Sequence, residues 1–282
     1  MSADNAHAHF AGDWLALREP LDHAARNSRL TAAAAERLHT SREKKPQTIV
    51  DLGSGSGSNL RYLAPRFPGP QHWRLLDHDP ALLAAATRAS ASTRDAAGDP
   101  VDISADVVDL GQAGWHSQLD GAALVTASAL FDLVTADWVR DLARACASRE
   151  APGLFVLSVD GDISLSPSDV DDNVVFALLR AHQTRDKSFG AALGVQAPSV
   201  IQVAFEDVGY TVESAYAPWH IEGSTDALAG IALVEGWRDA VIEQSPADAD
   251  RINAWARRRI DALEAGGLRI SVGHRDLFVA PR

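Results

Sequence analysis

The chain has 282 residues, of which 46% are hydrophobic, enough for one large domain with a sizeable core. Its formal net charge is −12, from 38 acidic residues against 26 Lys and Arg, which argues against tight binding to DNA or bulk RNA. The single cysteine, Cys146, excludes an intrachain disulfide framework and a cysteine metal site.

The N-terminal segment, residues 1–45, is expected to form a helical cover that precedes the main domain. Its apolar residues recur at helical spacing, and we expect the helix to break near Pro20 because proline disrupts helix interiors. Arg18, Asp22 and Arg26 follow one another at intervals of four, which places them on one helix face. An exposed ion-pair ladder is the plain interpretation of this row.

The segment Val-Asp-Leu-Gly-Ser-Gly-Ser-Gly, residues 50–57, is the most informative in the chain. An apolar strand leads into it, and a helical run that includes Asn59 follows it. Glycine allows positive φ and a close approach of the backbone to a ligand, and a helix N-terminus offers free N–H groups to an anion. Strand, glycine turn and helix start together predict a nucleotide-type pocket.

The glycine spacing distinguishes between nucleotides. A dinucleotide-binding fold has the pattern G-x-G-x-x-G. Here Gly53, Gly55 and Gly57 alternate with serines, and the acid Asp51 stands two residues before the first glycine. The spacing disfavours an NAD-dependent oxidoreductase, which stays an alternative of a different class.

Three more predicted strands end in candidate site residues. The second strand ends in Asp77, which lies 20 residues after Gly57, the interval at which doubly wound folds place a ribose-binding carboxylate. His78 follows it, and Asp79-Pro80 opens the next helix. Two later strands end in further candidates for the same sheet edge: Asp106 and Val107 on the third, Ala127 and Ser128 on the fourth.

The second half of the chain continues to alternate strands and helices. Repeated βα units predict a parallel sheet with helices on both faces. Asp169, Asp171 and Asp172 are expected to cap a helix over about 169–182, and Arg257–Arg259 to form a solvated face. The other expected helices span 130–148, 199–208, 225–244 and 247–265, and the other expected strands span 153–159, 210–216, and 268–272 together with 276–279.

The order of these motifs resembles that of the class I S-adenosylmethionine (SAM)-dependent methyltransferases. The resemblance implies SAM as the cofactor and an α/β fold of the Rossmann-like methyltransferase type. It implies a doubly wound, mostly parallel seven-stranded sheet over residues 46–282, with an antiparallel last strand and helical insertions at about 161–198 and 221–267. In the family, the acid at the position of Asp77 bonds both ribose hydroxyls. The acid at the position of Asp106 lies near the adenine amino group, and the next residue packs on the ring.

The resemblance also assigns roles outside the glycine turn. Arg18 would lie over the cofactor mouth and pair the carboxylate of SAM or of the substrate. A polar loop over residues 182–194 would take part in substrate recognition, or else would be an ordered surface connection. The full set of expected cofactor-binding residues is Arg18, Asp51, Gly53, Ser54, Gly55, Gly57, Asn59, Asp77, His78, Asp106, Val107, Ala127 and Ser128.

Methyl transfer from a sulfonium mainly requires acceptor, methyl carbon and sulfur to be aligned in a dry pocket. A general base is needed only when the acceptor must lose a proton. The candidates for a base or an orienting group are Asp160, His220 and His274, each at or near a predicted strand end. No paired-ligand spacing near a carboxylate suggests a metal, so we expect none.

We expect a SAM-dependent methyltransferase that acts on an O or N atom of a small molecule. An RNA or protein methyltransferase is the alternative, although Ala127-Ser128-Ala129 replaces the Asn/Asp-Pro-Pro-Tyr/Phe motif of base-amino methyltransferases. A non-catalytic SAM-binding protein is a further alternative. We expect no nucleic-acid or membrane partner and a cytoplasmic location, because neither a signal pattern nor an apolar run of ~20 residues is evident. The sequence leaves a homodimer open.

Overall fold

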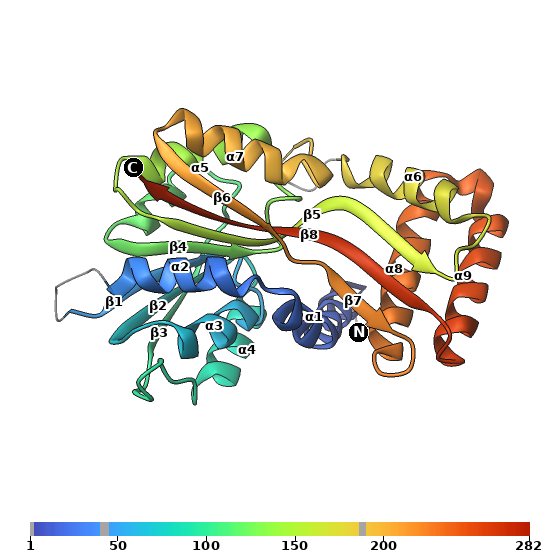
Figure 1. The fold of residues 1–282 in the computed structure, drawn as a ribbon, viewed down its shortest axis with the longest axis horizontal. Coiled ribbons are helices and arrows are strands. Elements are labelled where there is room, and N and C mark those ends of the chain that lie inside the picture. Colours follow the sequence, from blue (N-terminus) through green and yellow to red (C-terminus); the bar gives the residue numbers. More distant parts are fainter. Residues whose placement is uncertain (1–2, 40–44, 186–189) are drawn as a thin grey trace.

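The computed structural model describes residues 3–39, 45–185 and 190–282, and for residues 3–13 and 39 it describes the backbone only (Figure 1). Residues 186–189, part of the polar loop considered for substrate recognition, lie outside the described residues.

One mixed sheet runs through the molecule. Its strand order is β3-β2-β1-β4-β5-β8-β6, and β7 also pairs with β8. Neighbours among the first five strands are parallel, whereas β8 is antiparallel to β5, β6 and β7. The doubly wound, mostly parallel sheet with an antiparallel last strand is therefore confirmed, with β7 as an additional, eighth strand among the described residues. The strands are β1 (Gln47–Leu52), β2 (Gln71–Asp77), β3 (Asp102–Val107), β4 (Ala122–Ser128), β5 (Gly153–Ser166), β6 (Tyr210–Tyr216), β7 (Trp219–Glu222) and β8 (Arg269–Pro281).

Helices cover both faces of the sheet, as a doubly wound fold requires. One face packs against α2, α3 and α4 in one hydrophobic cluster, and the other face packs against α5 and α7 in a second. The helices of the described chain are α1 (Ala3–Ala25), α2 (Ser28–His39), α3 (Ser58–Leu63), α4 (Pro80–Ser90), α5 (Ala136–Ala147), α6 (Asp172–Gln183), α7 (Ala197–Asp207), α8 (Ala227–Gln244) and α9 (Ala249–Glu264).

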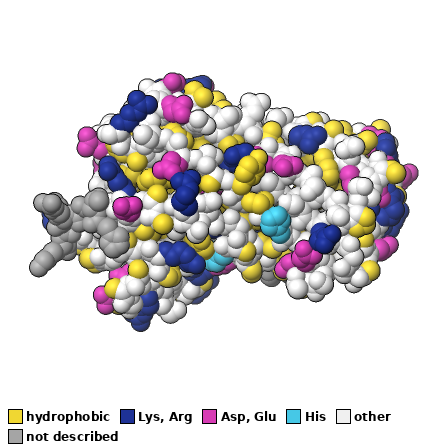
Figure 2. Space-filling view, viewed as in Figure 1, with side chains coloured by type: hydrophobic (Ala, Val, Ile, Leu, Met, Phe, Trp, Pro, Cys, Tyr) yellow, Lys and Arg dark blue, Asp and Glu magenta, His cyan; other side chains and the backbone are white. Residues whose placement is uncertain are grey.

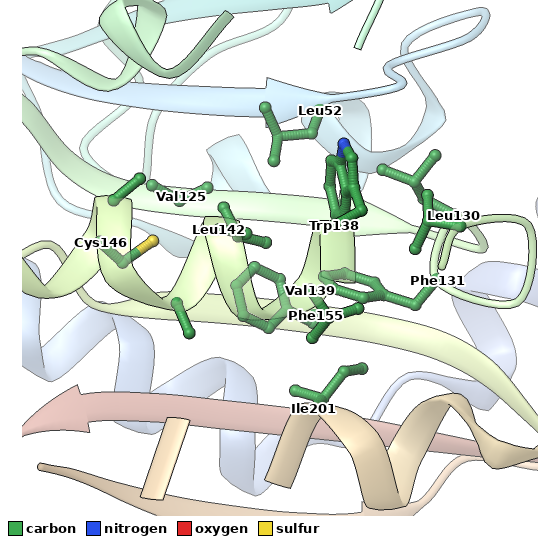
Figure 3. Close-up of a cluster of buried hydrophobic side chains, with 14 of the residues drawn as sticks. Leu52, Val125, Leu130, Phe131, Trp138, Val139, Leu142, Cys146, Phe155 and Ile201 are labelled. Carbon is green, nitrogen blue, oxygen red and sulfur yellow. The ribbon is translucent and has the colours of Figure 1, made fainter. Parts of the chain in front are cut away.

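The core between α5 and the sheet follows from the period-two alternation of the strands. Leu52 and Val125 point from their strands toward α5, which contributes Trp138 and Leu142 to the same cluster (Figure 3). The indole of Trp138 is 7% exposed and donates a hydrogen bond of 2.8 Å to the carbonyl of Leu110. This tryptophan is therefore a core residue, and its N–H is satisfied.

The paired strands β5 and β8 extend beyond the parallel part of the sheet toward α8 and α9 (Figure 1). Residues 163–166 of β5 pair with residues 269–272 of β8, and β7 pairs with the same part of β8. Helices α1, α6, α8 and α9 pack on this extension in a separate hydrophobic cluster that includes Phe176, Trp237 and Trp255. The segments expected as insertions thus pack against each other at one end of the sheet.

The N-terminal helix differs from the sequence expectation. Pro20 lies inside α1, and the chain bends at Asn27 instead. The bend is stabilised because the N–H of Asn27 donates to Asp276 Oδ2 at 2.8 Å, while its side-chain oxygen accepts from the N–H of Leu30 at 3.2 Å and caps α2. The expected exposed ladder is also wrong, because Asp22 and Arg26 are only 5% and 6% exposed.

The expected solvated face holds for Arg257 and Arg258, which are exposed, but is wrong for Arg259, which is only 6% exposed. Arg258 donates to both carboxylate oxygens of Asp169 at 2.8 Å, and Arg259 donates to Asp169 Oδ2 at 3.0 Å. Asp171 accepts from Arg251 Nε at 2.7 Å and from Arg258 Nη2 at 2.8 Å, and these bonds hold the pKa of Asp171 below its usual range. The bonds from Arg258 likewise hold the pKa of Asp169 below its usual range. The acidic turn before α6 therefore anchors α9, a pairing between segments almost 90 residues apart.

On the face shown in Figure 2, Lys and Arg side chains are scattered among Asp and Glu side chains. Among the described helices, none combines the length and the apolar character needed to cross a membrane.

Candidate functional site

The turn after β1 is shaped by its glycines. Gly53, Gly55 and Gly57 have φ values of 61°, 52° and 81°, in the left-handed region that L-residues disfavour. The N–H of Ser54 donates to the carbonyl of Leu76 at 3.0 Å, and that of Gly57 donates to the carbonyl of Ser54 at 2.9 Å. The turn is therefore closed on itself and attached to β2. Gly53 and Gly55 line a pocket, whereas Gly57 packs against Ala86, Arg61 and Ser90.

Asp77 lies at the end of β2 and binds the same turn. Its Oδ2 accepts from the N–H of Gly55 at 2.8 Å, and its Oδ1 accepts from the N–H of Asp79 at 3.0 Å. The residue is 6% exposed, whereas the side chain of His78 is 82% exposed and places Nδ1 3.3 Å from Asp77 Oδ1. Each carboxylate oxygen keeps a second lone pair for a ligand.

Asp51 is the most deeply buried acid of the site, at 1% exposure. Its Oδ1 accepts from Asn59 Nδ2 at 2.8 Å, but its Oδ2 has no partner among the described residues. Asn59 in turn donates to Thr126 Oγ1 at 3.0 Å and accepts from Arg26 Nη1 at 2.8 Å. Burial raises the pKa of Asp51 to about 7, so this carboxyl is poised to respond to a cation.

The glycine turn, Asp51 and Asn59 line a pocket of about 120 Å³, which we call the glycine-loop pocket, whereas Asp77 is not among its lining residues. The side chain of Leu15 on α1 closes one side of it, and the hydroxyl of Ser54 is buried there without a partner in the described chain. Unpaired buried polar atoms are costly, so their presence marks a place for a polar ligand. The residues that define this pocket are Leu15, Arg18, Asp22, Asp51, Gly53–Ser56, Ser58, Asn59, Ser128 and Ala129.

A second pocket, of about 320 Å³, adjoins the first. We call it the tryptophan pocket because Trp14, Trp219 and Trp237 contribute to its walls. Arg18 and Ala129 line both pockets, which places them at the boundary between the two. The arrangement resembles two neighbouring ligand chambers, of which the second has the aromatic side chains.

Asp22 fixes the side chains at this boundary. Its Oδ2 accepts from Arg18 Nε at 2.9 Å, and its Oδ1 accepts from the indole N–H of Trp219 at 3.1 Å. The guanidinium of Arg18 lies over the Trp219 ring, 5.4 Å from its centre. One carboxylate therefore orients both the cation and the aromatic ring on which it stacks.

His274 is the one expected catalytic residue that lines the tryptophan pocket. Its Nδ1 lies 3.0 Å from the carbonyl of Val272, so Nδ1 carries the hydrogen and Nε2 keeps its lone pair. Burial, together with the charge of Arg18, lowers the pKa of His274 to about 4. The imidazole is therefore neutral near pH 7, and its ring lies 4.9 Å from that of Trp219.

Two residues of the tryptophan pocket have a left-handed backbone without being glycine. Ala129 and Leu157 have φ values of 51° and 56°. The backbone of Leu157 is stabilised because its N–H donates to Asp276 Oδ1 at 2.9 Å. The other oxygen, Asp276 Oδ2, lies 3.9 Å from Arg26 Nε. Such strain concentrates at ligand sites, where surrounding contacts maintain it.

The other expected catalytic residues lie apart from both pockets. Asp160 Oδ1 accepts from the N–H of Asp162 at 3.1 Å, and its other oxygen lies 3.5 Å from Arg275 Nε in a separate surface groove. The neighbours of Asp160 on the strand line the tryptophan pocket, because successive side chains point to opposite faces. His220 is exposed on β7 for the same reason, since its neighbour Trp219 is buried.

The expected adenine-side residues are open to solvent. Asp106 and Val107 end β3, where Val107 pairs in register with Asp77, and Val107 is 61% exposed. On β4, Ser128 lines the glycine-loop pocket, whereas Ala127 is fully buried in the core beneath it. The carboxyl ends of neighbouring parallel strands thus meet at one edge, as the topology requires.

The sequence interpretation did not identify the three tryptophans or Asp22 as site residues. Trp14 and Trp237 stand in ordinary helical apolar patterns, so their spacing alone favours a core role. Gln183, the last residue of α6, also lines the tryptophan pocket. The signal that was present is the four-residue interval between Arg18 and Asp22, which predicts their contact but not its surroundings.

No protein-family model matches the chain, and no curated protein sequence is similar enough to match it. Solved structures with a similar course of the chain include a SAM-dependent methyltransferase from Geobacter sulfurreducens in complex with S-adenosyl-L-homocysteine. Its identity is 16% and its TM-score 0.44, over 92% of this chain and 93% of that one. YjhP from E. coli has 16% identity and a TM-score of 0.43, over 95% and 99% of the two chains.

The cyclopropane synthase MmaA2 from Mycobacterium tuberculosis has 10% identity and a TM-score of 0.46, over 89% of this chain and 82% of that one. Similarities of this size carry no functional assignment, which rests on the site itself.

Proposed function

We propose that the protein is a class I SAM-dependent methyltransferase that transfers a methyl group to an O or N atom of a small molecule. The observation that carries this proposal is the unpaired Oδ2 of Asp51. It lines a pocket formed by a left-handed glycine turn and lies close to the chamber that would hold the acceptor. The methionyl part of SAM carries an ammonium group, which is the kind of partner a buried, unpaired carboxylate requires.

The residues at the carboxyl ends of β2 and β3 are suited to the ribose and the adenine of SAM. The ribose hydroxyls are donors, and Asp77 has free lone pairs at the turn. The exposed Val107 offers an apolar surface for a purine ring, with Asp106 beside it for the adenine amino group. Gly53 and Gly55 bring the backbone of the turn to the pocket, and helix α1 covers the pocket through Leu15. Arg18 stands where either the carboxylate of SAM or an anionic acceptor would reach it.

When bound, SAM supplies an activated methyl group on a sulfonium. The chain's own task is to hold the acceptor in the tryptophan pocket, orient it and exclude water. His274 Nε2 is proposed to accept a hydrogen bond from the acceptor, because it is unprotonated and His274 lines that pocket. Asp160 and His220 lie apart from the pocket, so we assign neither of them a catalytic role.

A small acceptor fits the dimensions of the tryptophan pocket. Its volume of about 320 Å³ is in the range of small-molecule sites. Basic side chains are scattered among acidic ones on the face in Figure 2, as expected for a protein that does not track a phosphate backbone.

Calorimetry with SAM, S-adenosylhomocysteine, NAD and NADP tests the cofactor. We expect the two adenosyl compounds to bind and the two dinucleotides not to bind. Asp51→Asn should weaken the binding of SAM more than it weakens the binding of a SAM analogue that lacks the amino group. Binding of NAD in place of SAM would overturn the proposal. Transfer of tritiated methyl groups to fractionated cell extract tests catalysis. Label in the small-molecule fraction is the expected result, and label only in RNA or protein would redirect the proposal to the macromolecular alternative.

A further inference from the structure

The tryptophan pocket has one predominantly aromatic wall. Trp14 and Trp219 lie edge to face, with ring centres 6.1 Å apart at 67°, and Trp237 lines the same space. Aliphatic side chains such as Leu133 and Val272 complete the lining. Indole faces bind flat apolar rings better than they bind flexible polar chains, so the lining favours a planar ligand.

A cation stands where this pocket meets the glycine-loop pocket. The side chain of Arg18 is 16% exposed, and its one hydrogen bond within the described chain is from Nε to Asp22. Its two Nη groups therefore retain their donors. The guanidinium itself is oriented because Asp22 binds its Nε and the Trp219 ring lies beneath it. An oriented guanidinium with free donors is suited to an anionic oxygen and repels an ammonium group.

A hydrogen-bond acceptor lies on the same side. His274 contacts the ring of Trp219, and Arg18 stacks on that same ring. The Nδ1–H of His274 is used by the Val272 carbonyl, which leaves Nε2 to accept a hydrogen bond. A hydroxyl acceptor can donate that bond, whereas a carboxylate cannot.

We propose that the methyl acceptor is a planar aromatic hydroxyl compound, methylated on its oxygen, whose ring lies against the tryptophans and whose developing oxyanion is held by Arg18. This inference rests on the proposed function and narrows its acceptor to one chemical class. It assigns Arg18 to the acceptor rather than to the carboxylate of SAM, because the guanidinium lies over Trp219, a wall of the acceptor chamber. Asp22 is a positioning residue in this arrangement.

The reaction is balanced without a further reagent. The hydroxyl, hydrogen-bonded to His274 Nε2 and with its oxygen held by Arg18, loses its proton to water. The acceptor oxygen forms the new bond to the methyl carbon with its own electron pair. The carbon–sulfur bond breaks, and its pair stays on sulfur, which leaves as a neutral thioether. The products are the aryl methyl ether, S-adenosylhomocysteine and one proton.

The test uses the full chain saturated with S-adenosylhomocysteine and the probe 4-nitrophenol, whose anion is yellow. Because no methyl group is present, absorbance reports the ionisation of the bound probe and tryptophan fluorescence reports its binding. We expect quenching of fluorescence and ionisation of the bound phenol at a lower pH than in free solution. 4-Nitroanisole, which has no proton to lose, serves as the ring control.

Variants separate the parts of the site. Arg18→Gln should raise the dissociation constant of 4-nitrophenolate by roughly 10–100-fold and abolish its ionisation shift, the usual effect of losing a charge-assisted hydrogen bond. It should leave 4-nitroanisole nearly unchanged. Arg18→Lys should restore part of the shift, and Trp237→Leu should weaken both ligands equally. Arg275→Gln, which lies in the separate groove, should behave as the unmodified protein.

The outcomes distinguish this inference from the proposed function. If S-adenosylhomocysteine binds but 4-nitrophenol does not, the acceptor class is wrong and the methyltransferase proposal stands. If Arg18→Gln weakens S-adenosylhomocysteine and leaves 4-nitrophenol unchanged, Arg18 serves the cofactor and the inference fails. Tighter binding of 4-nitrobenzoate than of 4-nitrophenol would replace the hydroxyl class by the carboxylates. If S-adenosylhomocysteine itself does not bind, the proposed function fails first.

Discussion

The N–H of Gly55 and the carboxylate of Asp77 lie 2.8 Å apart, so the turn after β1 and the end of β2 form one unit. A ligand that bonds the carboxylate therefore also meets a turn whose conformation that carboxylate maintains. Substitutions on either side are expected to affect both the ligand and the turn.

Asp77→Ala should weaken SAM binding by about 1–3 kcal/mol, because it removes an acceptor and strands the N–H groups of Gly55 and Asp79. Asp77→Asn, which retains one acceptor oxygen, should lose less. Calorimetric titration with SAM measures both. Asp102→Ala is the control, since that side chain is 76% exposed at the first residue of β3, away from the carboxyl edge. An unchanged dissociation constant in folded Asp77→Ala would remove Asp77 from the site.

Gly55→Val should abolish SAM binding. The residue has a φ of 52°, and a side chain there would project toward Leu15 across the space that the ligand needs. Gly114→Ala supplies the control, because Gly114 has a φ of 95° with open space around it and lies far along the chain from the turn. Both substitutions incur backbone strain of about 1–2 kcal/mol, so only Gly55→Val should lose the ligand. Retained affinity in Gly55→Val would contradict the assignment of the turn.

Asp51→Asn should become more stable relative to the unmodified protein as the pH rises from 4 to 7. The folded pKa of Asp51 is raised to about 7, above its unfolded value, so its contribution to stability is present at low pH and is lost through this window. The difference in the free energy of unfolding between the two proteins should grow by at most roughly 1.4 kcal/mol per pH unit up to about pH 7 and then remain constant. Urea denaturation of both proteins between pH 4 and 8 measures it. Parallel curves would mean that Asp51 is not the buried, unpaired acid described above.

His274→Gln should show the opposite trend. The folded pKa of His274 is lowered to about 4, so its contribution to stability is present above pH 6.5 and is lost as the pH falls toward 4. Between pH 4 and 6.5 the unmodified protein should therefore gain stability relative to the variant, by up to about 3 kcal/mol in total. His220→Gln is the control, because His220 is exposed and should follow the unmodified protein at every pH. Equal pH dependence in all three proteins would contradict the burial of a neutral His274.

Asp276→Ala should lower the free energy of unfolding by about 3–5 kcal/mol, since it leaves Arg26 as an uncompensated buried charge. It also removes the acceptor of the Leu157 and Asn27 N–H groups. Chemical denaturation at pH 7 measures the loss. The free energy of unfolding of Asp276→Asn should lie between those of Asp276→Ala and the unmodified protein. A loss below 1 kcal/mol would show that Arg26 is satisfied in another way.

The parts of the fold that local chemistry determines could be predicted from the sequence. Strands β1, β2, β4 and β6 lie within a residue or two of their expected positions, because apolar runs end in glycine or acidic turns. The contact between turn and carboxylate was expected in outline, since the carboxyl ends of parallel strands share an edge.

The remaining features depend on contacts between distant segments, which no local pattern records. Helix α5 begins at Ala136 rather than at residue 130, because Thr135 caps it through a hydrogen bond to the N–H of Trp138. The bend at Asn27 depends on Asp276, and the burial of Arg259 depends on Asp169. The tryptophan pocket likewise gathers residues from α1, β7, α8 and β8, whose apolar spacing alone indicates a core.

The row of charges formed by Arg18 and Asp22 of α1 and by Arg26, directly after it, has a consequence for any truncated or fused form of the protein. Arg18 and Asp22 contact Trp219 of β7, while Arg26 bonds Asn59 of α3 and faces Asp276 of β8. A deletion that stops before Trp14 leaves these three residues in place. A deletion that continues through Arg26 leaves the buried carboxyl group of Asp276 without its facing cation. It also removes Arg18, which lines both chambers. A shortened protein of that kind should lose its ligands together with much of its stability.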